Sequence, residues 1–189
     1  MANLNDVDWS RLPPPKDDGA AAHLRGAGLA SVVLPATDGT TVDLSALAGT
    51  TVLYLYPMTG RPDVALPDGW DGIPGARGCT PQSCAFRDHH AELRELGVTR
   101  LYGLSTQTTE YQMEAADRMH LPFALLSDAD HAFGTAMRLP TFEVDGMTLL
   151  KRMAMIVRDG VVVKMFYPVF PPDQNAQDVV DWLRSETIR

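Results

Sequence analysis

Residues 78–88 read GCTPQSCAFRD and contain both cysteines of the chain. Proline is tolerated in the first turn of a helix and disfavoured in its interior, so Pro81 predicts a helix that begins close to Cys79. We expect this helix to cover about residues 81–96, with Thr80 as its N-cap. The Cys79 sulfur would then lie beside unpaired backbone N–H groups and the positive end of the helix dipole. Such surroundings favour the thiolate, which is the nucleophilic form of cysteine.

The two cysteines, Cys79 and Cys84, lie five positions apart. Two cysteines in a chain of 189 residues are too few for the disulfide scaffold of a small secreted domain. A local pair in a reducing compartment indicates chemistry instead. The spacing alone leaves open the alternative that both are small buried hydrophobic residues.

Composition and charge limit the classes of protein and partner. A chain of 189 residues with 45% hydrophobic and 21% charged residues can bury one sizeable core, which predicts a single domain. The net charge of −8 argues against nucleic acid or an anionic membrane as a partner, because such surfaces attract clustered Lys and Arg. No apolar run has membrane-spanning length, and the beginning lacks the pattern of a signal peptide, so we expect a cytoplasmic protein.

The order of strand and helix signals predicts an α/β protein. Residues 1–27 are polar and rich in proline, which indicates an extended N-terminal arm before a single domain over residues 28–189. Thr109 and Gln112 have capping-box spacing, and Asp159-Gly160 is a strong hairpin turn signal. The expected strands cover residues 31–34, 51–56, 101–104, 123–126, 153–157 and 161–166, and further helices begin near Thr109 and cover residues 129–137 and 175–183.

A long connection leads into Cys79. Residues 58–78 are rich in Gly and Pro and exceed the roughly 12–15 residues that are usual for loops in compact domains. Long loops inside a compact domain tend to be functional or disordered. We expect Trp70 to anchor this loop locally, because an aromatic side chain in a Gly/Pro segment supplies a large apolar contact.

The Cys-Thr-Pro-x-x-Cys-x-Phe-Arg-Asp string of residues 79–88 resembles the active-site helix of the peroxiredoxins, and among them of the peroxiredoxin Q and bacterioferritin comigratory proteins. These proteins belong to the alkyl hydroperoxide reductase and thiol-specific antioxidant superfamily. The likeness covers roughly residues 28–183 in the order of the family. Outside the helix it is carried by residues 34–39, 54–57, 103–106, 122–128 and Arg152.

This resemblance implies a thioredoxin-like fold, with a central mixed β-sheet flanked by helices, and a thiol-dependent peroxidase. It implies that Cys79 attacks hydrogen peroxide or an organic hydroperoxide and becomes a sulfenic acid. Cys84 would then resolve it as an intramolecular disulfide, which a thioredoxin-type partner would reduce. Arg152 matches the family's arginine beside the peroxidatic sulfur, where a cation favours the thiolate and orients the peroxide. The resemblance implies no cofactor and no metal, and a monomer or homodimer.

The sequence departs from the family pattern next to the active site. The family reads Pro-x-x-x-Thr-x-x-Cys, whereas Gly72 and Ala76 occupy the places of the proline and the threonine here. A long segment, residues 58–78, replaces the family's short connection. Either Thr59 or another donor supplies the missing hydroxyl, or backbone N–H groups and Arg152 suffice.

Two other functions fit a thioredoxin-like domain less well. A protein disulfide oxidoreductase normally carries Cys-x-x-Cys, whereas four residues separate the cysteines here. A metal-binding module would need a third ligand that converges with the two thiolates. His89 and His90 are adjacent, and adjacent helical residues point about 100° apart, so they do not converge on one ion.

Overall fold

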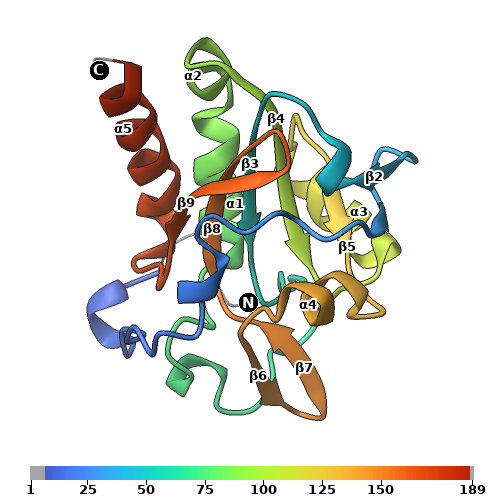
Figure 1. Ribbon diagram of the computed structural model, residues 1–189. Helices are drawn as coiled ribbons and strands as arrows, with labels where there is room; N and C mark the ends of the chain where they lie inside the picture. Colours follow the sequence, from blue (N-terminus) through green and yellow to red (C-terminus); the bar gives the residue numbers. More distant parts are fainter. Residues whose placement is uncertain (1–6, 188–189) are drawn as a thin grey trace.

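A five-stranded mixed sheet forms the centre of the computed structural model, which describes residues 7–187 (Figure 1). Its strands lie in the order β5-β4-β3-β8-β9. β4 is parallel to both β3 and β5, whereas β8 is antiparallel to both β3 and β9. The strands are β3 (Thr50–Leu55), β4 (Val98–Ser105), β5 (Leu125–Ser127), β8 (Met153–Arg158) and β9 (Val161–Phe166). The predicted hairpin around Asp159-Gly160 is confirmed, and both turn residues have positive φ, at 48° and 76°.

The α-helices are α1 (Cys79–Asp88), α2 (His90–Glu95), α3 (Thr109–Met119), α4 (Ala132–Met137) and α5 (Asn175–Thr187). The prediction of one helix over residues 81–96 is wrong at His89, which has φ −91° and ψ 4° and separates α1 from α2. The predicted cap of α3 is also displaced by one residue. Thr108, rather than Thr109, accepts a hydrogen bond from the backbone N–H of Tyr111.

Both faces of the sheet are buried, which explains why the part of β3 from Val52 onward is apolar on both faces. Val52, Tyr54 and Tyr56 belong to the core on one face, together with side chains of α1, α2 and α5. Leu53 and Leu55 belong to the core on the opposite face, with side chains of α4 and of the hairpin formed by β1 (Val33–Pro35) and β2 (Thr41–Asp43). Successive side chains of a strand point to opposite faces, so a central strand needs apolar residues at both. The predicted α/β class is confirmed.

Two small hairpins flank the main sheet, β1 (Val33–Pro35) with β2 (Thr41–Asp43), and β6 (Thr141–Val144) with β7 (Met147–Leu150). The sequence patterns did not predict the β6–β7 hairpin. Trp70 of the long loop is 4% exposed and packs against this hairpin, with its ring centroid 6.1 Å from that of Phe142. Trp70 thus anchors residues 58–78 locally, as expected.

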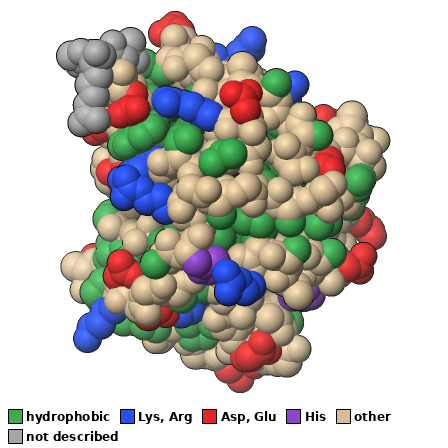
Figure 2. Space-filling view, viewed as in Figure 1, with side chains coloured by type: hydrophobic (Ala, Val, Ile, Leu, Met, Phe, Trp, Pro, Cys, Tyr) green, Lys and Arg blue, Asp and Glu red, His purple; other side chains and the backbone are tan. Residues whose placement is uncertain are grey.

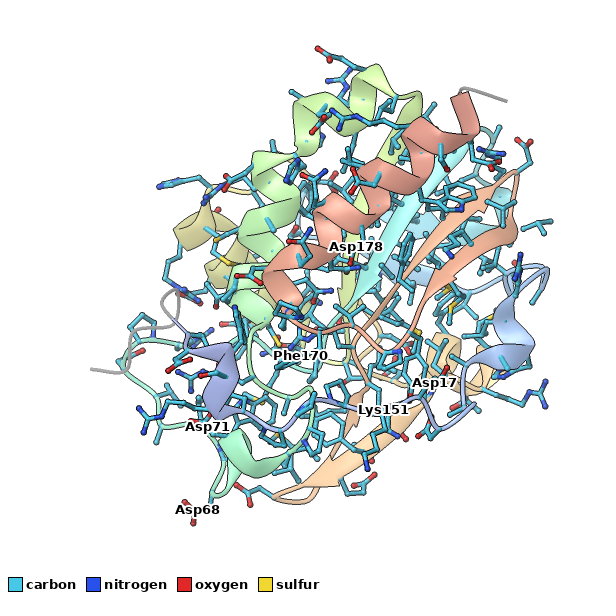
Figure 3. The ribbon with its side chains drawn as sticks, turned by 90° about the vertical axis from the view of Figure 1, so that its left-hand side faces the viewer. Asp17, Asp68, Asp71, Lys151, Phe170 and Asp178 are labelled. Carbon is cyan, nitrogen blue, oxygen red and sulfur yellow. The ribbon has the colours of Figure 1, made fainter. Side chains whose placement is uncertain are left out.

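Residues 7–27 of the predicted N-terminal arm lie along the molecule and are fastened at several places, while residues 1–6 lie outside the described residues (Figure 1). The Trp9 indole donates to Asp173 Oδ2 at 2.9 Å, and its ring centroid lies 6.1 Å from that of Phe170, near the beginning of α5 (Figure 3). Leu24 is fully buried in the core. The division of the chain at residue 27 stays a prediction. The short 3₁₀ helices are η1 (Trp9–Arg11), η2 (Ala22–Leu24), η3 (Leu44–Ala46), η4 (Trp70–Gly72) and η5 (Pro172–Gln174).

The charged side chains on the face seen in Figure 2 have both signs and are interspersed with apolar and neutral polar atoms. This face therefore presents no broad surface of a single charge. Among residues 7–187, no helix is both long and apolar enough to cross a membrane.

Candidate active site

Cys79 is the first residue of α1, two positions earlier than the sequence predicted. The N-cap is Gly78, whose φ of 109° lies in the region that glycine adopts without strain, so the prediction of Thr80 as the cap is wrong. The first helical hydrogen bond runs from the backbone N–H of Gln82 to the carbonyl of Gly78 at 3.0 Å. Pro81 therefore lies in the first turn, where its missing N–H costs nothing. Cys79 is 4% exposed and stands at the positive end of the helix dipole.

The Arg152 guanidinium lies directly beside the Cys79 sulfur. Its Nη2 is 3.1 Å from Sγ and donates to the carbonyl of Ala76 at 3.0 Å. Nε donates to the carbonyl of Gly75 at 3.3 Å, and Nη1 donates to Oε1 of Gln82. Arg152 is 3% exposed, and these oxygen partners are neutral, so its charge stays available to a thiolate at Cys79.

The sheet brings Arg152 to this place from far along the chain. Arg152 immediately precedes β8, and Met153 at the beginning of β8 pairs with Leu55 at the end of β3. The end of β3 is also where the loop that leads to Cys79 begins. The two residues are therefore adjacent because β8 is antiparallel to β3, although 73 positions separate them in the sequence.

A buried amide of α1, Gln82, contacts the guanidinium, and a second buried amide, Asn175 of α5, contacts Gln82 in turn. Gln82 is fully buried, accepts from Arg152 and donates from Nε2 to Oδ1 of Asn175 at 2.9 Å. Asn175, the first residue of α5, is also fully buried, and its Nδ2 has no hydrogen-bond partner. The sequence analysis missed both amides. A signal for Gln82 was present, since it lies three residues after Cys79 and residues at that spacing share a helix face.

Cys84 lies further along α1 and is half-buried, and both cysteines are free thiols. Burial raises the pKa of the Cys84 thiol, and the nearby Arg87 opposes part of this shift. The rise and rotation of a regular helix separate Cα atoms five residues apart by roughly 8–9 Å. A disulfide requires about 4.4–6.8 Å between Cα atoms. The two sulfurs therefore cannot join while α1 is intact.

A buried tyrosine fastens the segment between the cysteines to the sheet. The hydroxyl of Tyr54 on β3 donates to Oγ of Ser83 at 3.0 Å. The Tyr54 ring stacks on Phe86 with 4.5 Å between centroids. Burial raises the pKa of Tyr54 well above its ordinary value, so its hydroxyl remains a donor at physiological pH.

The structure shows what Ala76 contributes in the place of the family's threonine and which residue the Thr59 hydroxyl contacts. Ala76 is buried and contributes its carbonyl to Arg152, not a side-chain hydroxyl. Thr59 is fully buried, and its hydroxyl donates to Oε1 of Gln107 at 3.1 Å. The Nε2 of Gln107 donates in return to the carbonyl of Thr59 at 3.2 Å. The Thr59 hydroxyl is thus bound to Gln107, and the choice between the two alternatives stays a prediction.

The histidines do not converge with the cysteines. Within residues 7–187, no group of three or more His, Cys, Asp or Glu side chains is placed to hold a metal ion. His90 packs against Phe123, with 5.9 Å between ring centroids, and burial lowers its pKa. His89 pairs with Glu92 at 2.9 Å.

Comparisons with known proteins identify the family. The Redoxin family model matches residues 24–181. The chain is 26% identical over 162 residues to the chloroplastic peroxiredoxin Q of Populus jackii. The aligned residues cover 85% of this chain and 68% of the Populus protein. It is 38% identical over 99 residues to the peroxiredoxin Bcp of Escherichia coli K12. These residues cover 52% of this chain and 53% of the Escherichia coli protein.

Among solved structures, the peroxidoxin BcpB of Mycobacterium tuberculosis matches with a TM-score of 0.68 and 26% identity, over 85% of this chain and 96% of that one. A cysteine-to-serine mutant of PrxQ from Xylella fastidiosa matches with a TM-score of 0.69 and 18% identity. The match covers 86% of this chain and 96% of that one, and it supports the fold. The predicted thioredoxin-like fold is confirmed. The chain therefore belongs to the redoxins, and within them to the peroxiredoxins, the thiol-dependent peroxidases.

Proposed function

We propose that Cys79 is the residue that reduces the peroxide. Its thiolate attacks one peroxide oxygen, an S–O bond forms, and the O–O bond breaks. The sulfur loses two electrons and becomes a sulfenic acid, while the leaving oxygen takes a proton and departs as water or an alcohol. The observation that carries this proposal is the cation of Arg152, 3.1 Å from a sulfur at the first residue of a helix.

Cys84 then resolves the sulfenic acid. Its thiolate attacks the Cys79 sulfur, an S–S bond forms, and the hydroxyl departs as water after taking a proton. Because an intact α1 holds the Cα atoms roughly 8–9 Å apart, the first turn of the helix must unwind before this step. A dithiol protein of the thioredoxin type then reduces the disulfide by two exchanges and becomes oxidised itself.

Single-cysteine variants test these roles. Cys79→Ser should consume no peroxide, because it removes the nucleophile at the helix start. Cys84→Ser should consume about one equivalent and stop at a Cys79 sulfenic acid, which a dimedone-type probe labels. Mass spectrometry of the labelled peptide identifies the modified cysteine. Equal labelling of the two variants would contradict the assigned roles.

The wild-type chain tests the disulfide and the reductant. After one turnover, peptide mapping should show a Cys79–Cys84 bond within one chain, and thioredoxin should restore both thiols. A covalent dimer on a non-reducing gel would show that the resolving step joins two chains instead.

A further inference from the structure

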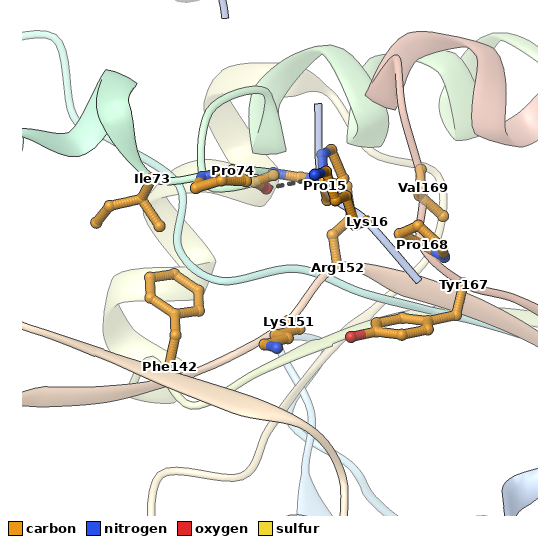
Figure 4. A pocket seen from close by; sticks show the side chains of 11 residues that line it. Pro15, Lys16, Ile73, Pro74, Phe142, Lys151, Arg152, Tyr167, Pro168 and Val169 are labelled. Atoms are coloured by element: carbon orange, nitrogen blue, oxygen red, sulfur yellow. Dashed lines mark hydrogen bonds between the residues drawn. The ribbon is translucent and has the colours of Figure 1, made fainter. Parts of the chain in front are cut away.

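Arg152 lines a cavity of about 220 Å³ (Figure 4). Lys16 and Lys151 also line this cavity, and no carboxylate is among the described residues that line it. The cavity therefore supplies no anionic acceptor that would fix the guanidinium on this side. The groups that hold Arg152 against Cys79 are its hydrogen-bond partners on the other sides.

The hydrogen-bond partners of Arg152 are of two kinds. Carbonyl groups of residues 75–77 accept from Nε and Nη2. Nη1 donates instead to a side chain, to Oε1 of Gln82 on α1. Because the guanidinium is planar, the position of Nη1 also sets the direction in which Nη2 points toward the Cys79 sulfur, 3.1 Å away. Gln82 therefore helps to determine the geometry at the reactive sulfur.

The amide of Gln82 has to be oriented in one way. Arginine has N–H donors and no acceptor, so Gln82 must present Oε1, not Nε2, to Arg152. Nε2 then points away and needs an acceptor of its own, which is Oδ1 of Asn175 at 2.9 Å. Both amides are fully buried, and a buried donor without an acceptor destabilises the folded state. Without Asn175, the amide of Gln82 would lose the contact that fixes its orientation.

Asn175 begins α5, but helix formation does not explain its side chain. Pro172, just before α5, packs so closely on the N-cap of α1 that a Cβ built at Gly78 would lie 2.6 Å from it. Asn175 has helical φ and ψ of −59° and −39°, so it is not an N-cap residue. Its Nδ2 is buried without a hydrogen-bond partner among the described residues, a destabilising feature that alanine would lack. The bond to Gln82 is therefore what accounts for an asparagine here.

We propose that Asn175 is a positioning residue for the peroxide step. It fixes the Gln82 amide, and this amide holds the Arg152 guanidinium at the reactive sulfur. The proposal rests on the assignment of Cys79 as the nucleophile. A cation held at the sulfur favours the thiolate, whereas a guanidinium that can move into the cavity does so less. Among the described hydrogen bonds, Asn175 reaches Arg152 only through Gln82.

The pH profile of alkylation by iodoacetamide tests this role in a Cys84→Ser chain, in which Cys79 is the remaining thiol. The pH at which alkylation reaches half its maximal rate should rise by about one unit in Asn175→Ala, because the guanidinium is held less firmly. Gln174→Ala is the matched control, since it removes an exposed amide one position away. Its midpoint should stay within about 0.2 unit of that of the Cys84→Ser chain.

A double substitution tests whether Asn175 acts through Gln82. Gln82→Met removes the oxygen that accepts from Arg152 and keeps a side chain of similar length. Asn175→Ala should then cause no further shift of the midpoint in a Gln82→Met chain. Additive shifts would overturn the proposal, and so would an unchanged midpoint in Asn175→Ala alone.

Asn175→Thr is a second variant for the case in which Asn175→Ala does not fold. Threonine fills more of the space, but its hydroxyl lies one bond closer to the backbone than Oδ1, so the bond to Gln82 is still lost. A raised midpoint in folded Asn175→Thr supports the proposal, and an unchanged one overturns it. Loss of the folded state in both variants would assign Asn175 a structural role and also overturn the proposal.

The alkylation profile reports on Cys79 and needs no peroxide. Tyr54 and Tyr56 also face Cys79, but burial raises the pKa of both, so they stay uncharged at neutral pH. A Cys84→Ser chain that shows the expected shift in Asn175→Ala and yet consumes no peroxide would support the placement of the guanidinium by Asn175. The same result would refute the proposed function itself.

Discussion

Tyr54→Phe should accelerate formation of the Cys79–Cys84 disulfide. The substitution removes the hydroxyl that donates to Ser83 and keeps the ring that stacks on Phe86. Ser83 lies in the turn that must unwind, so this hydrogen bond stabilises only the closed helix. A hydrogen bond of this kind contributes about 0.5–1.5 kcal/mol. A loss of about 1 kcal/mol raises the equilibrium constant for local opening about fivefold.

Rapid mixing of reduced protein with one equivalent of peroxide, followed by acid quenching and thiol counting, measures the rate of disulfide formation. Unwinding precedes the attack of Cys84, so we expect this rate to rise about fivefold in Tyr54→Phe. Tyr56→Phe is a matched control. Tyr56 continues the same strand and is equally buried, but its hydroxyl accepts from Gln112 of α3 and makes no bond to α1.

Hydrogen exchange supplies a second measurement of the same opening. Amides between Cys79 and Cys84 should exchange faster in reduced Tyr54→Phe than in reduced Tyr56→Phe. If exchange accelerates in this turn while the disulfide forms at the wild-type rate, unwinding does not limit resolution. If neither quantity changes, the bond to Ser83 does not hold the turn, and the reasoning is wrong.

Three further outcomes follow from the site. Arg152→Ala should slow alkylation of Cys79 by iodoacetamide at neutral pH about 10- to 100-fold, because a hydrogen bond to a charged group contributes about 1.5–3 kcal/mol; an unchanged rate would remove Arg152 from the site. Gly78→Ala should lower the free energy of unfolding in urea by at least about 1–3 kcal/mol, since φ is 109° and the new Cβ would lie 2.6 Å from Pro172. Disulfide formation should accelerate as the pH rises from 7 to about 9, because the Cys84 thiolate is the attacking form and an ordinary exposed cysteine thiol has a pKa of about 8.5; a flat profile in stopped-flow measurements would show that another step is limiting.

Short sequence patterns predicted the elements that are specified by neighbouring residues in the sequence. The Asp159-Gly160 turn between two apolar runs identified the β8–β9 hairpin. The β6–β7 hairpin carries the same kind of signal in Asp145-Gly146, whose φ values are 46° and 73°, yet its strands are short and partly exposed. Its apolar support comes from Trp70 in the long loop, a contact between distant segments that a sequence window does not contain.

In the candidate site, too, local sequence predicted some residues, whereas others are brought to the site by contacts between distant segments. Pro81 identified the helix start at Cys79, although the cap was misplaced because Gly78 permits the helix to begin earlier. Arg152 came from family resemblance, since only the pairing of β8 with β3 brings it to the sulfur. Asn175 could not be recognised, because its role depends on α5 meeting α1 side by side.

In the proposed mechanism, the first turn of α1 serves two steps with opposite demands. Attack on peroxide needs Cys79 held against Arg152, whereas resolution needs the same turn to open. A thiolate at Cys79 would attract the guanidinium, whereas a sulfenic acid is neutral, so the proposed oxidation would weaken the contact that holds the turn closed. Opening also exposes Cys84 to water, which removes the burial that raises its pKa and increases the thiolate fraction. The peroxide step thus promotes both conditions that the resolving step requires.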